Sequence, residues 1–170
     1  MVVVAGTNKD EMNYWFVNSE YFYDTSFEIR RTLKRSEANL RSWNKYRSAI
    51  WRYKGAEEPL RRMSKSNINL YSYRLDWDEE DDGVFGDYSL FVGAAHGIDV
   101  PFISNSFDME QIPWYIKNIL FPESSAEGRD ALSSLMMRYW GNIAKYGDPN
   151  EKIHQILTCL AFRKLILRYE

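Results

Sequence analysis

The run of three valines at residues 2–4 is the feature that most constrains what this chain can fold into. It is short, entirely apolar and β-branched, and residues 5–8 follow it with the loop-like composition Ala-Gly-Thr-Asn. This pattern is typical of a strand buried on both faces, which occurs in parallel sheets covered by helices. A second strand is predicted over residues 69–75, which are rich in aromatic side chains. The sequence therefore predicts an α/β fold.

Two helices are predicted from the spacing of apolar residues. The first begins near Ser124, ends at Gly147 and carries a stripe of Leu132, Leu135, Met136, Tyr139, Trp140, Ile143 and Ala144. The second is predicted over residues 29–53, where one face carries Leu40, Trp43, Tyr46, Ile50 and Tyr53. We interpret both faces as packed in the core. The aromatic-rich residues 14–23 could either line a pocket or pack in the core.

Charge is unevenly distributed along the chain, although its 170 residues carry a net charge of only -2. Residues 30–65 contain 12 basic and three acidic residues, and residues 76–87 contain seven acidic residues and no basic ones. A basic helix can bind nucleic acid, but the adjacent acidic run argues against that function. We therefore expect no nucleic-acid ligand and interpret the basic residues as solvated helix faces.

Other sequence features exclude several classes of protein. No segment approaches the roughly 18 to 20 continuous apolar residues of a membrane-spanning helix, and no signal peptide precedes the first strand, so a cytoplasmic location is the default expectation. Cys159 has no partner for a disulfide within the chain. Cys159, His96 and His154 do not have the spacing of metal ligands, so we expect neither a metal nor a cofactor.

His96 and Glu11 are the candidates for catalysis. Residues 93–97, Gly-Ala-Ala-His-Gly, form a segment with few side chains, which lets an imidazole stand clear of its neighbours. Glu11 follows the first strand, and its carboxylate could accept the imidazole N–H and hold the tautomer. Each residue could instead be structural. The order strand, acid, strand, histidine is informative because an α/β-hydrolase triad runs Ser, then Asp or Glu, then His.

Four segments, in this order, together resemble a known family: residues 6–11, 71–79, 93–102 and 136–150. They are similar to the C-terminal portion of a type-B carboxylesterase, in the family that includes the cholinesterases. The resemblance implies an α/β-hydrolase fold and a serine carboxylic-ester hydrolase that works through an acyl-enzyme. It matches Glu11 to the family's triad acid and His96 to its triad histidine. Asp99 stands where relatives often have Glu, and it receives no catalytic role.

The resemblance covers residues 1–150 as the C-terminal segment of a hydrolase domain and leaves residues 151–170 as a divergent amphipathic helical tail. No Gly-x-Ser-x-Gly elbow and no Gly-rich oxyanion segment occurs in the sequence. We interpret the nearby serines as loop or cap residues: Ser104, Ser106, Ser124 and Ser125. The nucleophile is therefore absent from this chain, and we expect the chain to be inactive alone.

Completion by an N-terminal part would make a small-molecule carboxylic ester the substrate. The predicted strands need parallel neighbours, so we also expect unpaired strand edges and dependence on a complementing chain or an oligomer. The alternative is a non-enzymatic binding or structural module derived from the hydrolase fold. Such a module would bind a partner through its basic helix, within residues 30–65, and its tail.

Overall fold

A computed structural model describes residues 1–27, 30–80, 87–108, 112, 114–150 and 167–168 of the chain. Its main sheet has the strand order β1-β4-β5, with β1 at Val2–Asn8, β4 at Asn69–Leu75 and β5 at Leu167–Arg168. β1 and β4 run parallel, from Val2 opposite Asn69 to Asn8 opposite Leu75, and β5 pairs antiparallel with β4. The predicted α/β fold is confirmed.

β1 is longer than the valine run that predicted it, because residues 5–8 continue the strand instead of forming a loop. Gly6 is required there, since a Cβ at this position would overlap the ring of Tyr73 on β4. The valines are only half-buried, whereas Leu70, Tyr71 and Leu75 of β4 are buried. The difference arises because β1 is an edge strand, and among the described residues it pairs with β4 alone.

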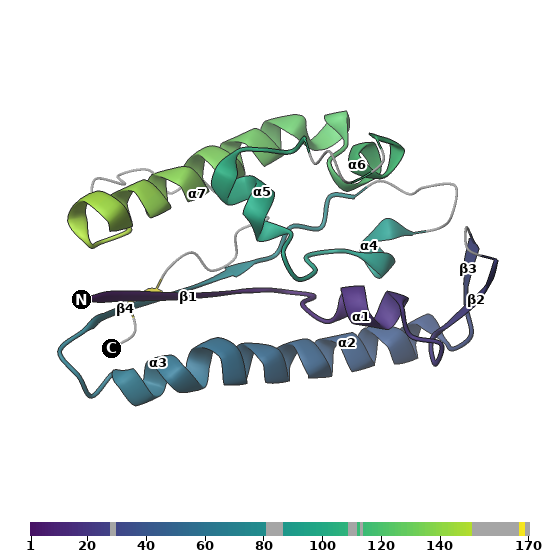
Figure 1. The fold of residues 1–170 in the computed structure, drawn as a ribbon, viewed down its shortest axis with the longest axis horizontal. Helices are drawn as coiled ribbons and strands as arrows, with labels where there is room; N and C mark the ends of the chain where they lie inside the picture. Colours follow the sequence, from purple (N-terminus) through teal and green to yellow (C-terminus); the bar gives the residue numbers. More distant parts are fainter. Residues whose placement is uncertain (28–29, 81–86, 109–111, 113, 151–166, 169–170) are drawn as a thin grey trace.

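Helices lie on both faces of β1 and β4 (Figure 1). One face is covered by α2 (Glu37–Arg52), which continues through a π-helical turn (Tyr53–Glu57) into α3 (Glu58–Met63). The other face carries α5 (Asp99–Ser104) and α7 (Ala126–Tyr146), with α6 (Trp114–Leu120) and a 3-10 turn (Glu123–Ser125) beside them. Two short helices, α1 (Asn13–Val17) and α4 (Tyr88–Phe91), follow β1 and precede the histidine segment.

The helix predicted over residues 29–53 begins later than expected, continues beyond residue 53 through the π-helical turn into α3, and presents a different face to the core. Its N-terminal part forms β3 (Arg30–Leu33), paired antiparallel with β2 (Tyr23–Phe27), and α2 starts after Ser36, whose hydroxyl accepts the Asn39 N–H. The buried residues of α2 are Leu40, Asn44 and Ser48.

The aromatic side of that helix is exposed, at Trp43, Tyr46, Ile50 and Tyr53. The prediction that this side packs in the core is therefore wrong, except at Leu40. Apolar periodicity identifies which residues share a helix face, but it does not identify what covers that face. Asn44 and Ser48 are polar and yet lie on the buried side of α2, because they form hydrogen bonds with each other and with the segment after β1.

α7 matches the helix predicted for residues 124–147, although Ser124 lies in the preceding 3-10 turn. Gly147 ends α7 in the left-handed conformation (φ 70°), and its N–H bonds to Ile143 O. The apolar stripe is most buried in its N-terminal half, where Leu132 and Met136 pack with Leu75, Trp77 and Phe102 into the main hydrophobic cluster.

Two further predictions concern the termini and the membrane. Leu167–Arg168 form a strand, so the predicted helical tail does not extend over these two residues, and most of residues 151–170 lies outside the described part of the chain. No helix among the described residues has the length and apolarity needed to cross a membrane.

Candidate active site

Glu11 and His96 lie side by side, as the sequence order suggested. Glu11 follows β1, His96 precedes α5, and Glu11 Oε2 lies 2.8 Å from His96 Nδ1. The two side chains differ sharply in exposure, at 4% for Glu11 and 53% for His96. A buried carboxylate therefore holds one nitrogen of an imidazole whose ring reaches the surface.

The second oxygen of Glu11 also has a hydrogen-bond partner. Glu11 Oε1 accepts the backbone N–H of Asn8 at 2.7 Å. A carboxylate group only accepts hydrogen bonds, so beside the Glu11 carboxylate the tautomer that forms the bond carries its proton on Nδ1 of His96, and Nδ1–H donates to Oε2. Nε2 of the same ring then has a free lone pair. An imidazole in this tautomer can take up a proton at Nε2, as a general base must.

Backbone hydrogen bonds join the segment after β1 to its neighbours. Lys9 N–H donates to Leu75 O at 2.8 Å, and Asp10 N–H donates to Ala94 O at 2.9 Å. Gly93 makes the close approach feasible, because it has φ +49° and a Cβ there would lie 2.9 Å from Ser89 O and 3.0 Å from the Asp10 carboxylate. The glycine-rich composition around His96 thus serves the packing of the two segments as well as access to the imidazole.

Asp99 connects the histidine segment to the sheet, a role that sequence patterns did not predict. Its carboxylate accepts a hydrogen bond from Tyr73 Oη at 2.8 Å and lies 3.4 Å from Asn8 Nδ2. Asn8 Nδ2 also donates to Ala95 O at 2.8 Å. Burial, together with the charge of Asp99, raises the pKa of Tyr73 well above its ordinary value, so its hydroxyl stays protonated and donates.

Two tryptophans flank the imidazole of His96. The ring centroids of Trp15 on α1 and Trp51 on α2 lie 5.4 and 5.5 Å from the imidazole centroid, and 5.5 Å from each other. Trp15 belongs to the aromatic-rich residues 14–23, which divide between surface and core: Tyr14 is exposed and Tyr23 is fully buried. Trp51 could not be predicted from the sequence, since no local pattern relates a residue of α2 to a histidine 45 positions away.

The serines that we interpreted as loop or cap residues include two whose hydroxyls are occupied locally. Ser104 Oγ donates to Val100 O at 2.9 Å, and Ser125 Oγ donates to Pro122 O at 3.1 Å. Each bond is to a backbone carbonyl of the same turn, an arrangement common for serine in helices and turns.

Comparison with known proteins relates the chain to esterases and neuroligins. No family model matches it. It is 37% identical to human and Macaca mulatta neuroligin-3 and 36% identical to human neuroligin-2, each over 62 residues, or 36% of this chain. Those 62 residues are 28% of the Macaca mulatta protein and 7% of each human one.

The solved structure of a PNB esterase matches 88% of this chain with a TM-score of 0.51 and 18% sequence identity. The match covers 30% of the esterase chain, so this chain spans less than a third of the proteins that it resembles. The chain therefore has part of the α/β-hydrolase fold of an esterase, and over 62 residues its sequence is similar to neuroligins.

Proposed function

We propose that this chain provides the acid and the histidine of a serine carboxylic-ester hydrolase, and that another segment provides the nucleophile and the oxyanion-hole donors. The observation that carries the proposal is the hydrogen bond between buried Glu11 and the exposed imidazole of His96, 2.8 Å long. The missing elements are the Gly-x-Ser-x-Gly elbow and the Gly-rich oxyanion segment, which the sequence lacks.

Each proposed step depends on Nε2 of His96. This atom accepts the serine hydroxyl proton as the serine oxygen attacks the ester carbonyl carbon, and it then returns the proton to the leaving alcohol. In the second half-reaction, Nε2 accepts a proton from the water that attacks the acyl-enzyme and returns it to the serine. Glu11 stabilises the imidazolium in both halves, because its carboxylate is already held by the Asn8 N–H.

The edge of β1 supports the proposal that a further segment completes the site. β1 pairs with β4 on one side, and no other described strand pairs with it on the opposite side. The backbone groups on that side of a parallel strand can hydrogen-bond to another strand, and an open edge of this kind favours strand addition. A parallel strand added there would lie next to the strand that leads to Glu11.

Ester hydrolysis by the chain, with and without a complementing segment, tests the proposal. The chain should not hydrolyse p-nitrophenyl acetate faster than free imidazole does. Co-expression with the N-terminal segment of a carboxylesterase, which carries Gly-x-Ser-x-Gly, should produce turnover. His96→Ala should lower that turnover by about 10³-fold or more. His154→Ala, which changes the other histidine of the chain, is the matched control and should leave it unchanged.

Two results would contradict the proposal. Turnover by the chain alone that is lost in His96→Ala would mean that this chain contains its own nucleophile. Turnover by the complemented protein that is unaffected by both His96→Ala and Glu11→Gln would mean that the two residues do not take part in the reaction.

A binding or structural module is the second candidate function. It is favoured by the exposed side of α2 and of the π-helical turn that follows it, where Trp43, Tyr46 and Tyr53 are all 40% exposed or more. Association through the basic residues of 30–65 should weaken as salt is added, whereas association through the aromatic residues should persist. Sedimentation at 50 mM and 500 mM NaCl distinguishes these surfaces, and a chain that is monomeric under both conditions contradicts self-association through either.

A further inference from the structure

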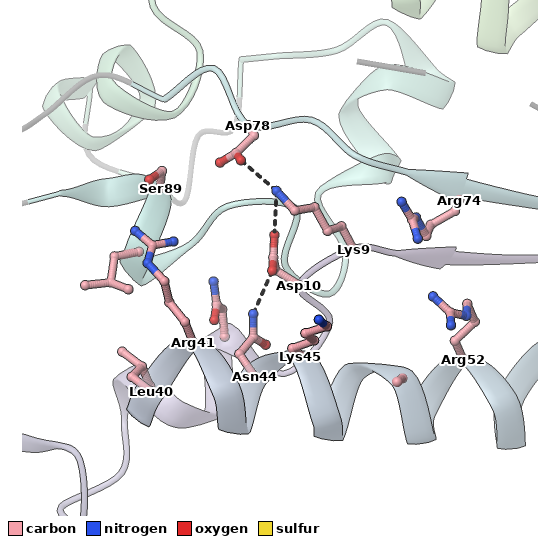
Figure 2. Close-up of a pocket in the computed structure, with 13 residues that line it drawn as sticks. Lys9, Asp10, Leu40, Arg41, Asn44, Lys45, Arg52, Arg74, Asp78 and Ser89 are labelled. Carbon is pink, nitrogen blue, oxygen red and sulfur yellow. Dashed lines mark hydrogen bonds and ion pairs between the residues drawn. The ribbon is translucent and has the colours of Figure 1, made fainter. Parts of the chain in front are cut away.

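A cavity of about 400 Å³ lies between α2 and the segments that follow β1 and β4 (Figure 2). It is separate from the Glu11–His96 pair, because neither residue is among its lining. Its volume falls in the range of small-molecule sites. The walls are rich in basic side chains from three elements: Lys9, Arg41, Lys45, Arg52 and Arg74.

The basic residues come from both walls of the cavity. Arg41, Lys45 and Arg52 lie on one side of α2, at positions i, i+4 and i+11. Lys9, directly after β1, and Arg74, on β4, face them from the other wall (Figure 2). Arg74 can reach this side of the sheet because alternate residues of a strand point to opposite faces, and its neighbour Tyr73 contacts Asp99 on the other face. Like charges therefore approach the same space from opposite sides.

The acidic residues of the lining are already engaged. Asp78 binds Lys9 at 2.7 Å. Asp10 lies 3.9 Å from the same ammonium group and accepts a hydrogen bond of 2.6 Å from Asn44. Figure 2 shows this chain of contacts running through the middle of the cavity. These two acids therefore neutralise the region around Lys9. Arg74 of β4 is paired with Asp76 through two contacts of its guanidinium, so the basic residues of α2 carry the remaining donors.

The basic residues of α2 retain unused donors toward the cavity. Arg52 pairs with Glu57 through Nε at 2.8 Å, and Glu57 does not line the cavity. Arg41 pairs with Glu37 through Nε at 2.6 Å, and its Nη2 lies 3.6 Å from Asp87. A guanidinium has five N–H donors, so terminal N–H groups remain after these bonds. Within the described part of the chain, no carboxylate lies within ion-pair distance of Lys45.

We propose that this cavity binds a small phosphorylated ligand, whose phosphate oxygens accept hydrogen bonds from Lys45 and Arg52. Four of the five basic residues of the lining have carboxylate partners, and among the described residues Lys45 has none. The Lys45 ammonium group and the terminal N–H groups of Arg52 are therefore the donors that favour an anion. Terminal guanidinium N–H groups match two oxygens of one phosphate, and an ammonium group adds a third donor. Leu40, Ala49 and Leu90 complete the wall and would contact the apolar part of an organic phosphate. The site adds a binding activity that is independent of ester hydrolysis.

Calorimetric titration of the full chain with inorganic pyrophosphate tests this site, at an ionic strength held constant with NaCl. We expect saturable binding that weakens at least tenfold in Lys45→Ala and in Arg52→Ala. Both side chains are partly or fully exposed, so the variants should fold, and Lys45→Gln and Arg52→Gln give a second pair that preserves most of the side-chain length.

The matched controls are Arg61→Ala and Lys65→Ala, which remove the same charges from exposed positions outside the cavity. Unchanged affinity in both controls, combined with the loss in Lys45→Ala and Arg52→Ala, supports a defined site. The proposal is overturned if the wild-type chain shows no saturable binding, or if all four alanine variants weaken binding equally, because equal losses indicate attraction to the overall charge of residues 30–65.

Discussion

The side-chain amide of Asn44 donates a hydrogen bond of 2.6 Å to the carboxylate of Asp10, the residue directly before Glu11. Ser48, one turn along α2, donates to Asn44 Oδ1 at 3.0 Å and accepts the N–H of Met12 at 3.2 Å. Helix α2 thus holds the chain immediately before and immediately after the buried acid. The polar side of the helix positions Glu11 without touching it.

Ser48→Ala should weaken this attachment, because it removes both the acceptor for the Met12 N–H and the donor to Asn44. Leaving buried polar groups unpaired costs about 1–3 kcal/mol, and urea unfolding measures the loss. The downfield NMR resonance of the His96 Nδ1 proton should also broaden, since Glu11 is less well held. Ser48→Thr keeps the hydroxyl and should preserve the resonance. Loss of stability in Ser48→Ala with an unchanged resonance would limit Ser48 to a structural role.

Glu11→Gln should change the tautomer of His96. An amide places an N–H₂ group next to either the Asn8 N–H or the imidazole Nδ1, where the carboxylate now accepts from both. We expect the Nδ1–H form to be lost in part, which ¹⁵N NMR of the imidazole reports directly. The control is Glu127→Gln, at an exposed position of α7. Identical imidazole spectra for wild type and Glu11→Gln would contradict the assigned direction of the hydrogen bond.

Glu80 should make the stability of the chain dependent on pH. Its carboxylate oxygens are buried, and burial raises the pKa of Glu80 to about 8. Because this pKa exceeds that of the unfolded chain, the folded state retains a proton that the unfolded state has lost, and the contribution to stability falls as pH rises from about 4.5 to 8.

Glu80→Gln removes this titration. The variant should therefore gain at least about 1 kcal/mol relative to wild type between pH 5 and pH 8.5, as each pKa unit corresponds to about 1.4 kcal/mol. Thermal unfolding at the two pH values measures the gain. Glu79→Gln, at the exposed neighbouring position, should show no such pH-dependent gain. A constant difference between Glu80→Gln and wild type at both pH values would mean that the Glu80 carboxyl does not titrate in this window.

The two sides of α2 should respond differently to truncation. Leu40 is 1% exposed, and Leu40→Ala should cost about 2–5 kcal/mol, as other buried leucines do. Ile50 is 38% exposed, and Ile50→Ala should cost about 1 kcal/mol or less, because much of its side chain already contacts water. Urea unfolding of both variants measures the difference. Equal losses would restore the interpretation that the aromatic side packs in a core.

These results separate what the sequence could predict from what it could not. The β4 strand, the α7 helix and the pairing of Glu11 with His96 depend on local patterns and on their order along the chain, and the structure agrees with each. Which side of α2 is buried depends on the element that covers the helix. From the sequence alone, Asn44 and Ser48 would be assigned to the solvent-exposed side, because their hydrogen bonds to each other and to Asp10 are visible only in the structure.

Contacts between distant segments were the least predictable. Trp51 contacts His96 only because α2 runs alongside β1 and α1. The cavity lining combines basic residues from α2, β4 and the segment after β1. In the sequence these residues are far apart and share no pattern beyond the uneven distribution of charge. Neither arrangement leaves a periodic or spaced motif, so the tertiary structure was needed to find both.

The π-helical turn between α2 and α3 accommodates one extra residue within a nearly continuous helix. Glu58 N–H bonds to Tyr53 O, five residues back, so this turn contains one residue more than an α-helical turn. The extra residue rotates every later side chain by about 100° around a nearly continuous axis. Relatives that lack a single residue here could keep one unbroken α-helix, and sequence alignments should then place a one-residue gap within residues 53–57. In such an alignment, Trp51 would stand before the gap and Leu60 after it, and each would align with the equivalent residue of the relative.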